Sequence, residues 1–144
     1  MTVKKIRDLL SGRKLFKVSP ETSVREVSRI MAANTVGAVA IVEGGTLKGI
    51  ATERDIAFRA VGGDLDVDGT PISGIMTFDP VTIGIDDPIS NALALKLGDV
   101  FRHLPVMDGE DIVGILSYRD IPLDYVMMFE HFREMSAAHA DDVA

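Results

Sequence analysis

The feature that most constrains this chain is a short pattern that occurs twice, 65 residues apart. Residues 49–55 read GIATERD and residues 114–120 read GILSYRD. Each copy has a glycine, a short apolar run, a hydroxyl residue and an aspartate three positions later. Apolar positions also coincide at this offset from about residue 18 to residue 56. Two copies are too few for a solenoid, so the repeat predicts two similar units related by a pseudo-twofold axis and burying one shared core.

The spacing of apolar residues predicts the same elements in both units. Residues 20–33 have helical spacing, with Thr22 or Ser23 as the N-cap. The matching helix is expected to start near Asp86 or Asp87, to take Pro88 in its first turn and to end at Gly98. Short runs rich in Val and Ile predict four buried strands, paired through tight turns: 37–42, 47–51, 104–107 and 112–116. An extended segment leads into each unit, near Val18 and at 81–83.

A second helix is expected after the hydroxyl residue of each copy. In the second copy Pro122 lies too deep for a regular helix, because it removes a backbone donor, so a kink or restart is expected there. Beyond it, apolar residues recur at helical spacing: Tyr125, Met128, Phe129 and Phe132. Such a stripe faces either the core or another subunit. Together with Ile56, Ala60 and Val61 of the first unit, it predicts a homodimer.

Composition excludes several classes of function. The chain of 144 residues is 47% apolar, carries a net charge of −7 and has no cysteine, so disulfides and thiolate metal sites are excluded. The absence of a basic cluster argues against nucleic acid, and no apolar run is long enough to span a membrane. The N-terminus lacks the apolar run of a signal peptide, so a cytoplasmic protein is expected. No catalytic motif occurs and the three histidines lie far apart, so neither an enzyme nor a metal site is predicted.

The repeated pattern has two interpretations. Thr52 with Asp55, and Ser117 with Asp120, fit a capping box in which the hydroxyl and the acid satisfy backbone donors at a helix start. The same geometry suits an anionic ligand, because a helix start presents free N–H groups. The aspartate could then accept bonds from ribose hydroxyls, and the arginine before it could reach a phosphate. The match of all four residue types in both copies favours the ligand.

These residues resemble the cystathionine β-synthase (CBS) domain pair, or Bateman module. The resemblance lies in residues 49–56 (GIATERDI), 101–106 (FRHLPV) and 75–77 (IMT), and it covers about residues 3–132. It implies an α+β fold in which two β-α-β-β-α units pack sheet to sheet with pseudo-twofold symmetry. The expected organisation is a first CBS domain at 1–62, a linker at 63–70, a second CBS domain at 71–133 and a flexible tail at 134–144.

The resemblance also implies two clefts that bind an adenosine-containing ligand: AMP, ADP, ATP or S-adenosylmethionine. The aspartate would hold the ribose, the hydroxyl and nearby backbone would hold ribose or phosphate, and aliphatic residues would hold adenine. The first cleft would use Gly49, Ile50, Thr52, Arg54 and Asp55, with Asp87 and Phe101 from the other unit. The second would use Gly114, Ile115, Ser117, Arg119 and Asp120, with Arg102 and His103, and with Thr22, Val36 and Gly37 from the other unit.

Two points of that assignment stay open. Asp87 is an acid where the other copy has Thr22, and it would repel a phosphate in the first cleft. His103 fits a ligand contact or an ordinary surface or core position equally well. The predicted function is therefore a regulatory module that senses an adenosine ligand and acts through a protein partner. The alternatives are a dimeric scaffold with degenerate clefts and a small enzyme acting on a nucleotide.

Overall fold

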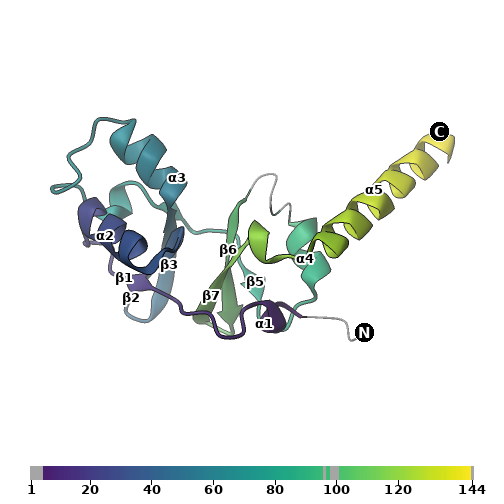
Figure 1. Ribbon diagram of the computed structural model, residues 1–144, viewed down its shortest axis with the longest axis horizontal. Helices are drawn as coiled ribbons and strands as arrows, with labels where there is room; N and C mark the ends of the chain where they lie inside the picture. The colour runs from purple at the N-terminus through teal and green to yellow at the C-terminus, as the bar shows by residue number, and fades with distance from the viewer. Residues whose placement is uncertain (1–4, 96, 98–100, 144) are drawn as a thin grey trace.

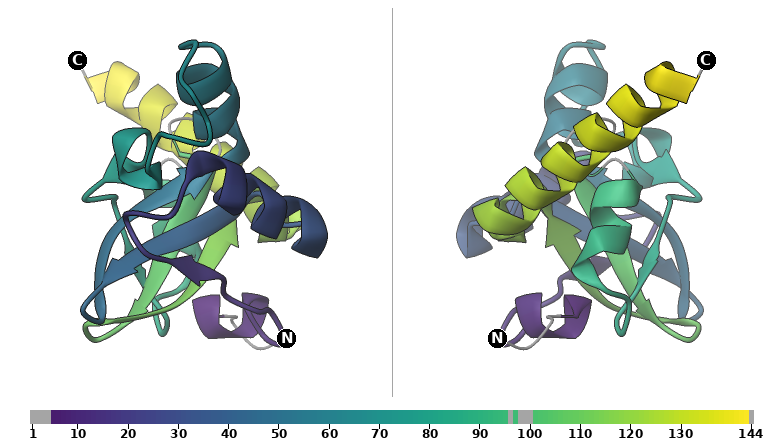
Figure 2. Two further views of the ribbon diagram at one scale, coloured as in Figure 1. Left: turned by 90° about the vertical axis from the view of Figure 1, so that its left-hand side faces the viewer. Right: turned by 90° about the vertical axis from the view of Figure 1, so that its right-hand side faces the viewer.

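The structure is a computed structural model that describes residues 5–95, 97 and 101–143, with side chains as far as residue 136. It contains two mixed α+β units whose sheets face each other, with most helices on the outer faces (Figures 1 and 2). One sheet has the strand order β1-β2-β3-β4 and the other β5-β6-β7. Strand β7 lies against β2 and β3 across the interface. The predicted fold class, two α+β repeats packed sheet to sheet, is confirmed.

The two units repeat a similar series of elements, except that β4 has no counterpart in the first part of the chain. The first part of the chain forms α1 (Ile6–Leu9), β1 (Lys17–Val18), α2 (Val24–Asn34), β2 (Ala38–Glu43), β3 (Thr46–Thr52), α3 (Glu53–Asp55) and a π-helix (Ile56–Val61). The second part forms a 3-10 turn (Ile72–Gly74), β4 (Thr77–Phe78), β5 (Ile83–Gly84), α4 (Ile89–Ala94), β6 (His103–Asp108), β7 (Asp111–Ser117), a 3-10 turn (Tyr118–Asp120) and α5 (Leu123–Val143). The short strands β1 and β5 run parallel to β2 and β6, and each hairpin is antiparallel.

Local chemistry explains where these elements begin and end. Of the two predicted caps for α2, Ser23 is the one used, since its hydroxyl accepts from the Glu26 N–H at 3.1 Å. The helix ends at Thr35, which is left-handed with φ 52°. All four predicted strands are present with small shifts of their ends. The turn of the first hairpin uses Gly44 and Gly45 at positive φ, and that of the second uses Gly109.

The helix of the second unit begins two or three residues later than the predicted start near Asp86 or Asp87. Pro88 is the N-cap, and α4 begins at Ile89. Asp87 instead closes the preceding turn, since its carboxylate accepts from the Gly84 N–H at 2.9 Å. That bond holds Asp87 before the helix. The predicted end at Gly98 lies outside the described residues.

The sequence predicts a helix directly after Ser117, but the structure has only a short turn there. Ser117 caps a 3-10 turn of three residues, and Ile121 then takes an extended conformation with φ −82° and ψ 125°. Proline disfavours the helical conformation of the residue before it. Pro122 therefore ends the turn at Ile121, and the chain restarts as α5. The predicted restart is confirmed. The segment after residue 133, expected to be a flexible tail, continues α5 as far as Val143.

The apolar stripe of α5 divides between the core and solvent. Tyr125 and Phe129 pack against the second unit's core, whereas Met128 and Phe132 are exposed. The sequence also predicts that Ala60 of the first unit belongs to the dimer face. Ala60 is fully buried, so that part of the prediction is wrong. Figure 1 shows α5 extending well beyond the body of the molecule. The exposed part of the stripe therefore lies on this projecting helix.

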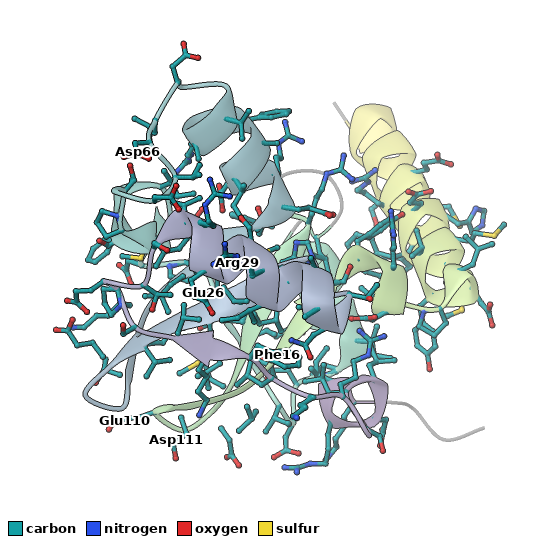
Figure 3. All side chains as sticks on the ribbon, turned by 60° about the vertical axis from the view of Figure 1, so that its left-hand side comes forward. Phe16, Glu26, Arg29, Asp66, Glu110 and Asp111 are labelled. Atoms are coloured by element: carbon teal, nitrogen blue, oxygen red, sulfur yellow. The ribbon has the colours of Figure 1, made fainter. Side chains whose placement is uncertain are left out.

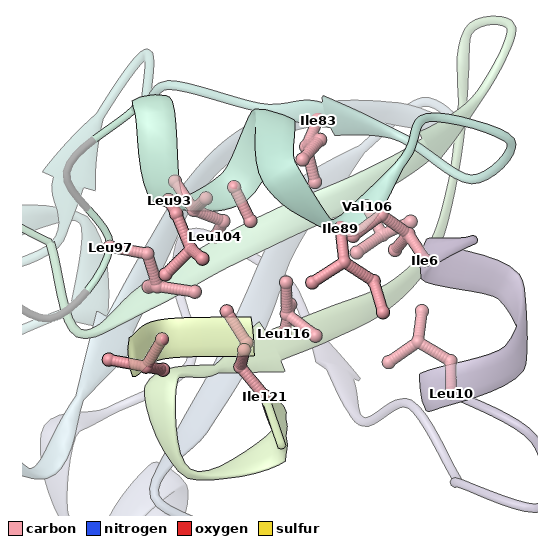
Figure 4. Packing of buried hydrophobic residues seen from close by; sticks show 12 residues of the cluster. Ile6, Leu10, Ile83, Ile89, Leu93, Leu97, Leu104, Val106, Leu116 and Ile121 are labelled. Atoms are coloured by element: carbon pink, nitrogen blue, oxygen red, sulfur yellow. The ribbon is translucent and has the colours of Figure 1, made fainter. Parts of the chain in front are cut away.

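The buried residues form two clusters rather than the one shared core expected from the sequence, because each sheet buries its outer face under its own helices. Each cluster is completed by a segment from the other half of the chain. Ile6 and Leu10 of the N-terminal segment pack with Ile83, Ile89 and other residues of the second unit (Figure 4). The reciprocal contact is made by the 3-10 turn before β4. Ile72 and Ile75 join the core of the first unit.

These exchanged segments pass very close to the glycine that opens each copy of the repeat. A Cβ atom at Gly49 would lie 2.5 Å from the Thr77 carbonyl oxygen. A Cβ atom at Gly114 would lie 2.7 Å from Cδ1 of Leu10. The first neighbour is backbone held in the β3–β4 pair, whereas the second is the end of a flexible side chain. The two glycines thus have different tolerance for a larger residue.

Gly49→Ala is expected to lower the free energy of unfolding by about 1–3 kcal/mol, the usual cost of overpacking. Gly114→Ala is expected to cost clearly less, because Leu10 can change rotamer. Urea denaturation of both variants, with the m-value compared to the parent, measures this difference. Equal losses, or a larger loss for Gly114→Ala, would show that the β3–β4 approach is not the tighter one.

Candidate functional site

Both copies of the repeated pattern form the predicted capping interactions. In the first copy the Asp55 N–H donates to Thr52 Oγ1 at 3.2 Å, and Asp55 Oδ2 accepts from the Thr52 N–H at 3.0 Å. In the second copy Asp120 Oδ2 accepts from the Ser117 N–H at 2.7 Å, and the Arg119 N–H donates to Ser117 Oγ at 3.3 Å. One carboxylate oxygen of each aspartate is therefore engaged in capping, which leaves the other oxygen to distinguish the two copies.

The second oxygen has a different partner in each copy. Asp55 Oδ1 lies 3.7 Å from Nε of Arg59, one turn further along the same helix. Arg59 is also held by the carbonyl oxygens of Ile75 and Met76. Asp120 Oδ1 forms an ion pair with Arg13, which comes from the segment between α1 and β1. The side chain of Asp120 is only 3% exposed, so this ion pair reaches a nearly buried carboxylate.

A cavity of about 1090 Å³, here called the Ser117 cavity, lies beside the second copy. The second unit contributes the beginning of β6, the end of β7 and the following 3-10 turn. The first unit contributes the end of α2, the beginning of β2, and α3 with its π-helix. Residues 11–16, here called the crossing segment, supply Arg13, Lys14, Leu15 and Phe16. The site is thus built from both units and the segment that joins them.

Most of the residues predicted for the second cleft line the Ser117 cavity: Gly114, Ile115, Ser117, Arg119, Arg102, His103, Val36 and Gly37. Asp120 is not among the lining residues, and its nearly buried carboxylate pairs with Arg13. Thr22 also lies outside the Ser117 cavity. Its hydroxyl lies 3.1 Å from that of Ser19, near the start of α2. The structure therefore brings eight of the ten predicted residues to one site.

The residues predicted for the first cleft do not line this cavity. Gly49 and Ile50 lie in β3 beside β4, and Thr52 with Asp55 forms the capping box. The Arg54 guanidinium stacks on Phe58, 4.7 Å from the ring centre. Two further members lie in the second unit. Asp87 closes its turn, and Phe101 packs against the core next to residues outside the description.

Sequence reasoning missed part of the lining of the Ser117 cavity. The missed side chains include Arg13, Lys14, Phe16, Met31, Glu53, Ile56 and Tyr118. Phe16 also packs against the core of the first unit, and Figure 3 shows it below α2. The residues of the crossing segment precede the repeated part of the sequence, and no motif marks them. Only the helical periodicity of Met31 and the position of Tyr118 inside the repeat could have indicated a role.

The charge of the cavity is opposite to that of the whole chain. Arg13, Lys14, Arg102 and Arg119 line it, and Glu53 is the one acid among the described lining residues. The chain as a whole carries −7. Charges beyond about 10 Å are largely screened at physiological salt, so the nearby cations decide the local potential. The cavity can therefore accept an anionic group beside an apolar or aromatic one.

His103 lies in the wall of the cavity at the start of β6. Its Nδ1 atom is buried and lacks a hydrogen-bond partner within the described part of the chain. Burial lowers the pKa of His103 below its ordinary value, and Arg102 and Arg119 lower it further. Glu53 and Asp120 act in the opposite direction. The ring is thus favoured in its neutral form, with one donor and one acceptor nitrogen.

The described residues contain no group of three His, Cys, Asp or Glu side chains placed to hold a metal ion. Their helices also lack the combination of length and hydropathy that a membrane span requires.

Comparison with known proteins identifies the fold as a pair of repeats of one family. The model of the CBS domain matches residues 6–62 and 72–121, which is most of the chain. The chain belongs to the CBS domain family. It is 34% identical over 107 residues to the CBS domain-containing protein YhcV of Bacillus subtilis (strain 168), covering 74% of this chain and 76% of that protein. It spans only 26% of the length of a longer relative from Arabidopsis thaliana.

Solved structures of CBS domains share this arrangement. The CBS domain protein PAE2072 from Pyrobaculum aerophilum, solved in complex with AMP, superimposes with a TM-score of 0.76 at 29% identity, covering 88% of this chain and 97% of that one. The CBS domain pair of protein MJ0100, in complex with 5'-methylthioadenosine and S-adenosyl-L-methionine, has a TM-score of 0.72 at 25% identity, covering 90% and 99%. Both relatives bind adenosine-containing ligands.

The lowered pKa of His103 predicts a pH-dependent stability of this CBS domain pair. Because the folded-state pKa lies below the ordinary value of about 6.5, the unfolded chain binds more protons between these two values. The contribution of His103 to stability is therefore lost as the pH falls from about 6.5 towards the folded-state pKa. Urea denaturation between pH 7.5 and 5 should show a shallower decline for His103→Gln than for the parent.

His131→Gln serves as the control, because His131 is exposed on α5 and lies outside the cavity. This variant should decline with pH as the parent does. An unchanged pH dependence in His103→Gln would contradict the assignment of a neutral, desolvated ring.

Proposed function

We propose that this CBS domain pair is a regulatory module that binds a phosphorylated adenosine ligand in the Ser117 cavity. The observation that carries the proposal is the combination in one cavity of apolar side chains with Arg13, Lys14, Arg102 and Arg119. An adenine base needs the first kind of surface and a phosphate needs the second. The AMP complex of a CBS domain protein with 29% identity supports the same ligand class.

The charge of the cavity favours a nucleotide over S-adenosylmethionine among the predicted ligands. The sulfonium centre of S-adenosylmethionine is positively charged and would lie among several cations, whereas AMP, ADP and ATP carry negative phosphates. Glu53 alone among the described lining residues could offset such a charge. At the short distances within one cavity, unfavourable pairs of like charge cost more than they do on an open surface.

The proposed roles follow the positions of the residues. Ser117 is proposed to meet the ribose together with Asp120, whose carboxylate accepts from the Ser117 N–H next to the cavity, and Arg119 and Arg102 are proposed to meet the phosphate. The side chains of Ile115 and Tyr118 belong to the apolar wall proposed for the base. The 3-10 turn that follows Ser117 is too short to provide a strong helix dipole, so the guanidinium groups are proposed to supply most of the attraction.

AMP is expected to raise the melting temperature of the parent chain, because a ligand at about 100 times its Kd adds about 2.7 kcal/mol of stability. Titration calorimetry then compares AMP with S-adenosylmethionine, and AMP should bind more tightly.

Asp120→Ala should weaken AMP binding by about ten-fold or more through loss of charge-assisted hydrogen bonds. Asp55→Ala removes the matching capping bonds outside the cavity, and its effect should be clearly smaller.

Equal losses in the two aspartate variants would mean that the loss of capping, rather than of a ligand contact, weakens binding. If AMP, ADP, ATP and S-adenosylmethionine all fail to bind at millimolar concentration, the sensor proposal is wrong and the scaffold alternative is favoured. Slow turnover of ATP would instead favour the enzyme alternative.

The homodimer predicted from the sequence remains a proposal, now assigned to α5. This helix exposes a group of large apolar side chains: Leu123, Met127, Met128, Phe132 and Met135. Exposed apolar groups of this size usually mark an interface. A twofold copy of the same helix would cover them in a closed assembly.

Phe132→Asp should therefore dissociate the dimer, because it places a charge in an apolar contact. Phe78→Asp is the matched control, since Phe78 on β4 has the same exposure of 72% but lies away from α5. Sedimentation velocity at micromolar concentrations measures both variants. A parent chain that sediments as a monomer across this range would disprove the dimer.

A further inference from the structure

The ion pair between Arg13 and Asp120 occupies the carboxylate that the proposed function needs for ribose. Asp120 has two oxygens, and Oδ2 accepts from the Ser117 N–H at 2.7 Å. Oδ1 is paired with Arg13, and the carboxylate is 3% exposed, so few directions remain from which another donor can approach. A ribose hydroxyl must therefore compete with the Arg13 guanidinium for the same oxygen.

Arg13 is held in place by its backbone rather than by a packed side chain. The Arg13 N–H donates to the Leu10 carbonyl oxygen at 3.0 Å, and Gly12 before it takes a positive φ of 78° in the turn that follows α1. Leu10 is anchored in the core of the second unit. The guanidinium end is different, since the Arg13 side chain is 51% exposed. It can move without disturbing the core.

The first copy of the repeat lacks this arrangement. Asp55 faces Arg59, which is also fastened to two backbone carbonyl oxygens of the 3-10 turn region before β4. The position equivalent to Arg59 in the second copy, 65 residues later, is Asp124, an acid. The leading segments align at an offset of 66, which places Ile6 on Ile72 and Leu10 on Met76, and at this offset the position equivalent to Arg13 is Asp79. The exchangeable cation is therefore a feature of the second copy.

We propose that Arg13 is a specificity-determining residue that exchanges Asp120 for the phosphate when a nucleotide binds. This inference rests on the proposed function of the Ser117 cavity. Arg13 both contacts Asp120 and lines the cavity, next to Lys14. A nucleotide supplies two things together, hydroxyl donors that replace Arg13 at Asp120 and a phosphate that accepts the displaced guanidinium. Adenosine supplies only the hydroxyl donors, so it must displace Arg13 without compensation.

With this exchange, the site prefers nucleotides over nucleosides more strongly than it would if Arg13 only contacted the phosphate. Arg13 opposes the binding of adenosine and assists the binding of AMP. Its removal should therefore change the two affinities in opposite directions. A cation that only contacts phosphate would change AMP binding and leave adenosine binding as it was.

The test is titration calorimetry of AMP and adenosine against the parent, Arg13→Ala and Arg13→Gln. Arg13→Ala should tighten adenosine binding by about two- to five-fold, because the competing guanidinium, which is half-exposed and so only modestly stabilised by its ion pair, is gone. The same change should weaken AMP binding by about ten-fold, because a charge-assisted contact to phosphate is lost. Arg13→Gln should change both affinities in the same directions as Arg13→Ala. Its amide can still donate to Asp120, so it serves as the second variant if Arg13→Ala does not fold.

Arg7→Ala is the matched control, because it removes an arginine of the same N-terminal segment from a surface ion pair with Asp86, outside the cavity. It should leave both affinities within two-fold of the parent. Weaker or unchanged adenosine binding in the folded Arg13 variants would overturn the exchange while leaving the nucleotide site intact. A parent chain that binds neither ligand would overturn the proposed function itself, and the exchange with it.

Discussion

The structure depends on the exchange of short segments between its two halves. Ile6 and Leu10 complete the core of the second unit, and Ile72 and Ile75 complete that of the first. Neither half of the chain therefore buries its apolar surface without a segment from the other, which makes the pair the unit of stability. Because α1 packs on the second unit, the crossing segment must run from the second unit to β1 of the first unit. In doing so it passes the Ser117 cavity.

The two copies of the repeat are unequal because of Pro122 after the second copy and because of the course of the crossing segment. The first copy continues as α3 and a π-helix, so Arg59 of the same helical stretch can face Asp55. The second copy is cut short by Pro122, and the cation that faces Asp120 comes instead from the crossing segment. Similar capping bonds therefore occur in two different electrostatic settings. The setting of the second copy, with several cations around one cavity, is the one suited to an anionic ligand.

Much of this fold is predictable from the sequence because the repeat and the strand pattern both constrain it. The strands, the paired units and the break at Pro122 follow from local periodicity and proline chemistry. The late start of α4 was not foreseen, because Asp87 is used to close a turn. Nor could the roles of Arg13 and Phe16 be foreseen. Their place in the cavity follows from the exchange of segments, a long-range packing choice that no local pattern records.

The central claim is that the Ser117 cavity is a nucleotide site formed by both units. Backbone NMR spectra of the parent chain during titration with AMP test it most directly, because they report each affected residue. Binding of AMP in the Ser117 cavity should cause saturable shifts in three places that are distant in sequence: residues 11–16, 36–37 and 114–120. Shifts centred on residues 49–55 instead, or none at millimolar AMP, would contradict it.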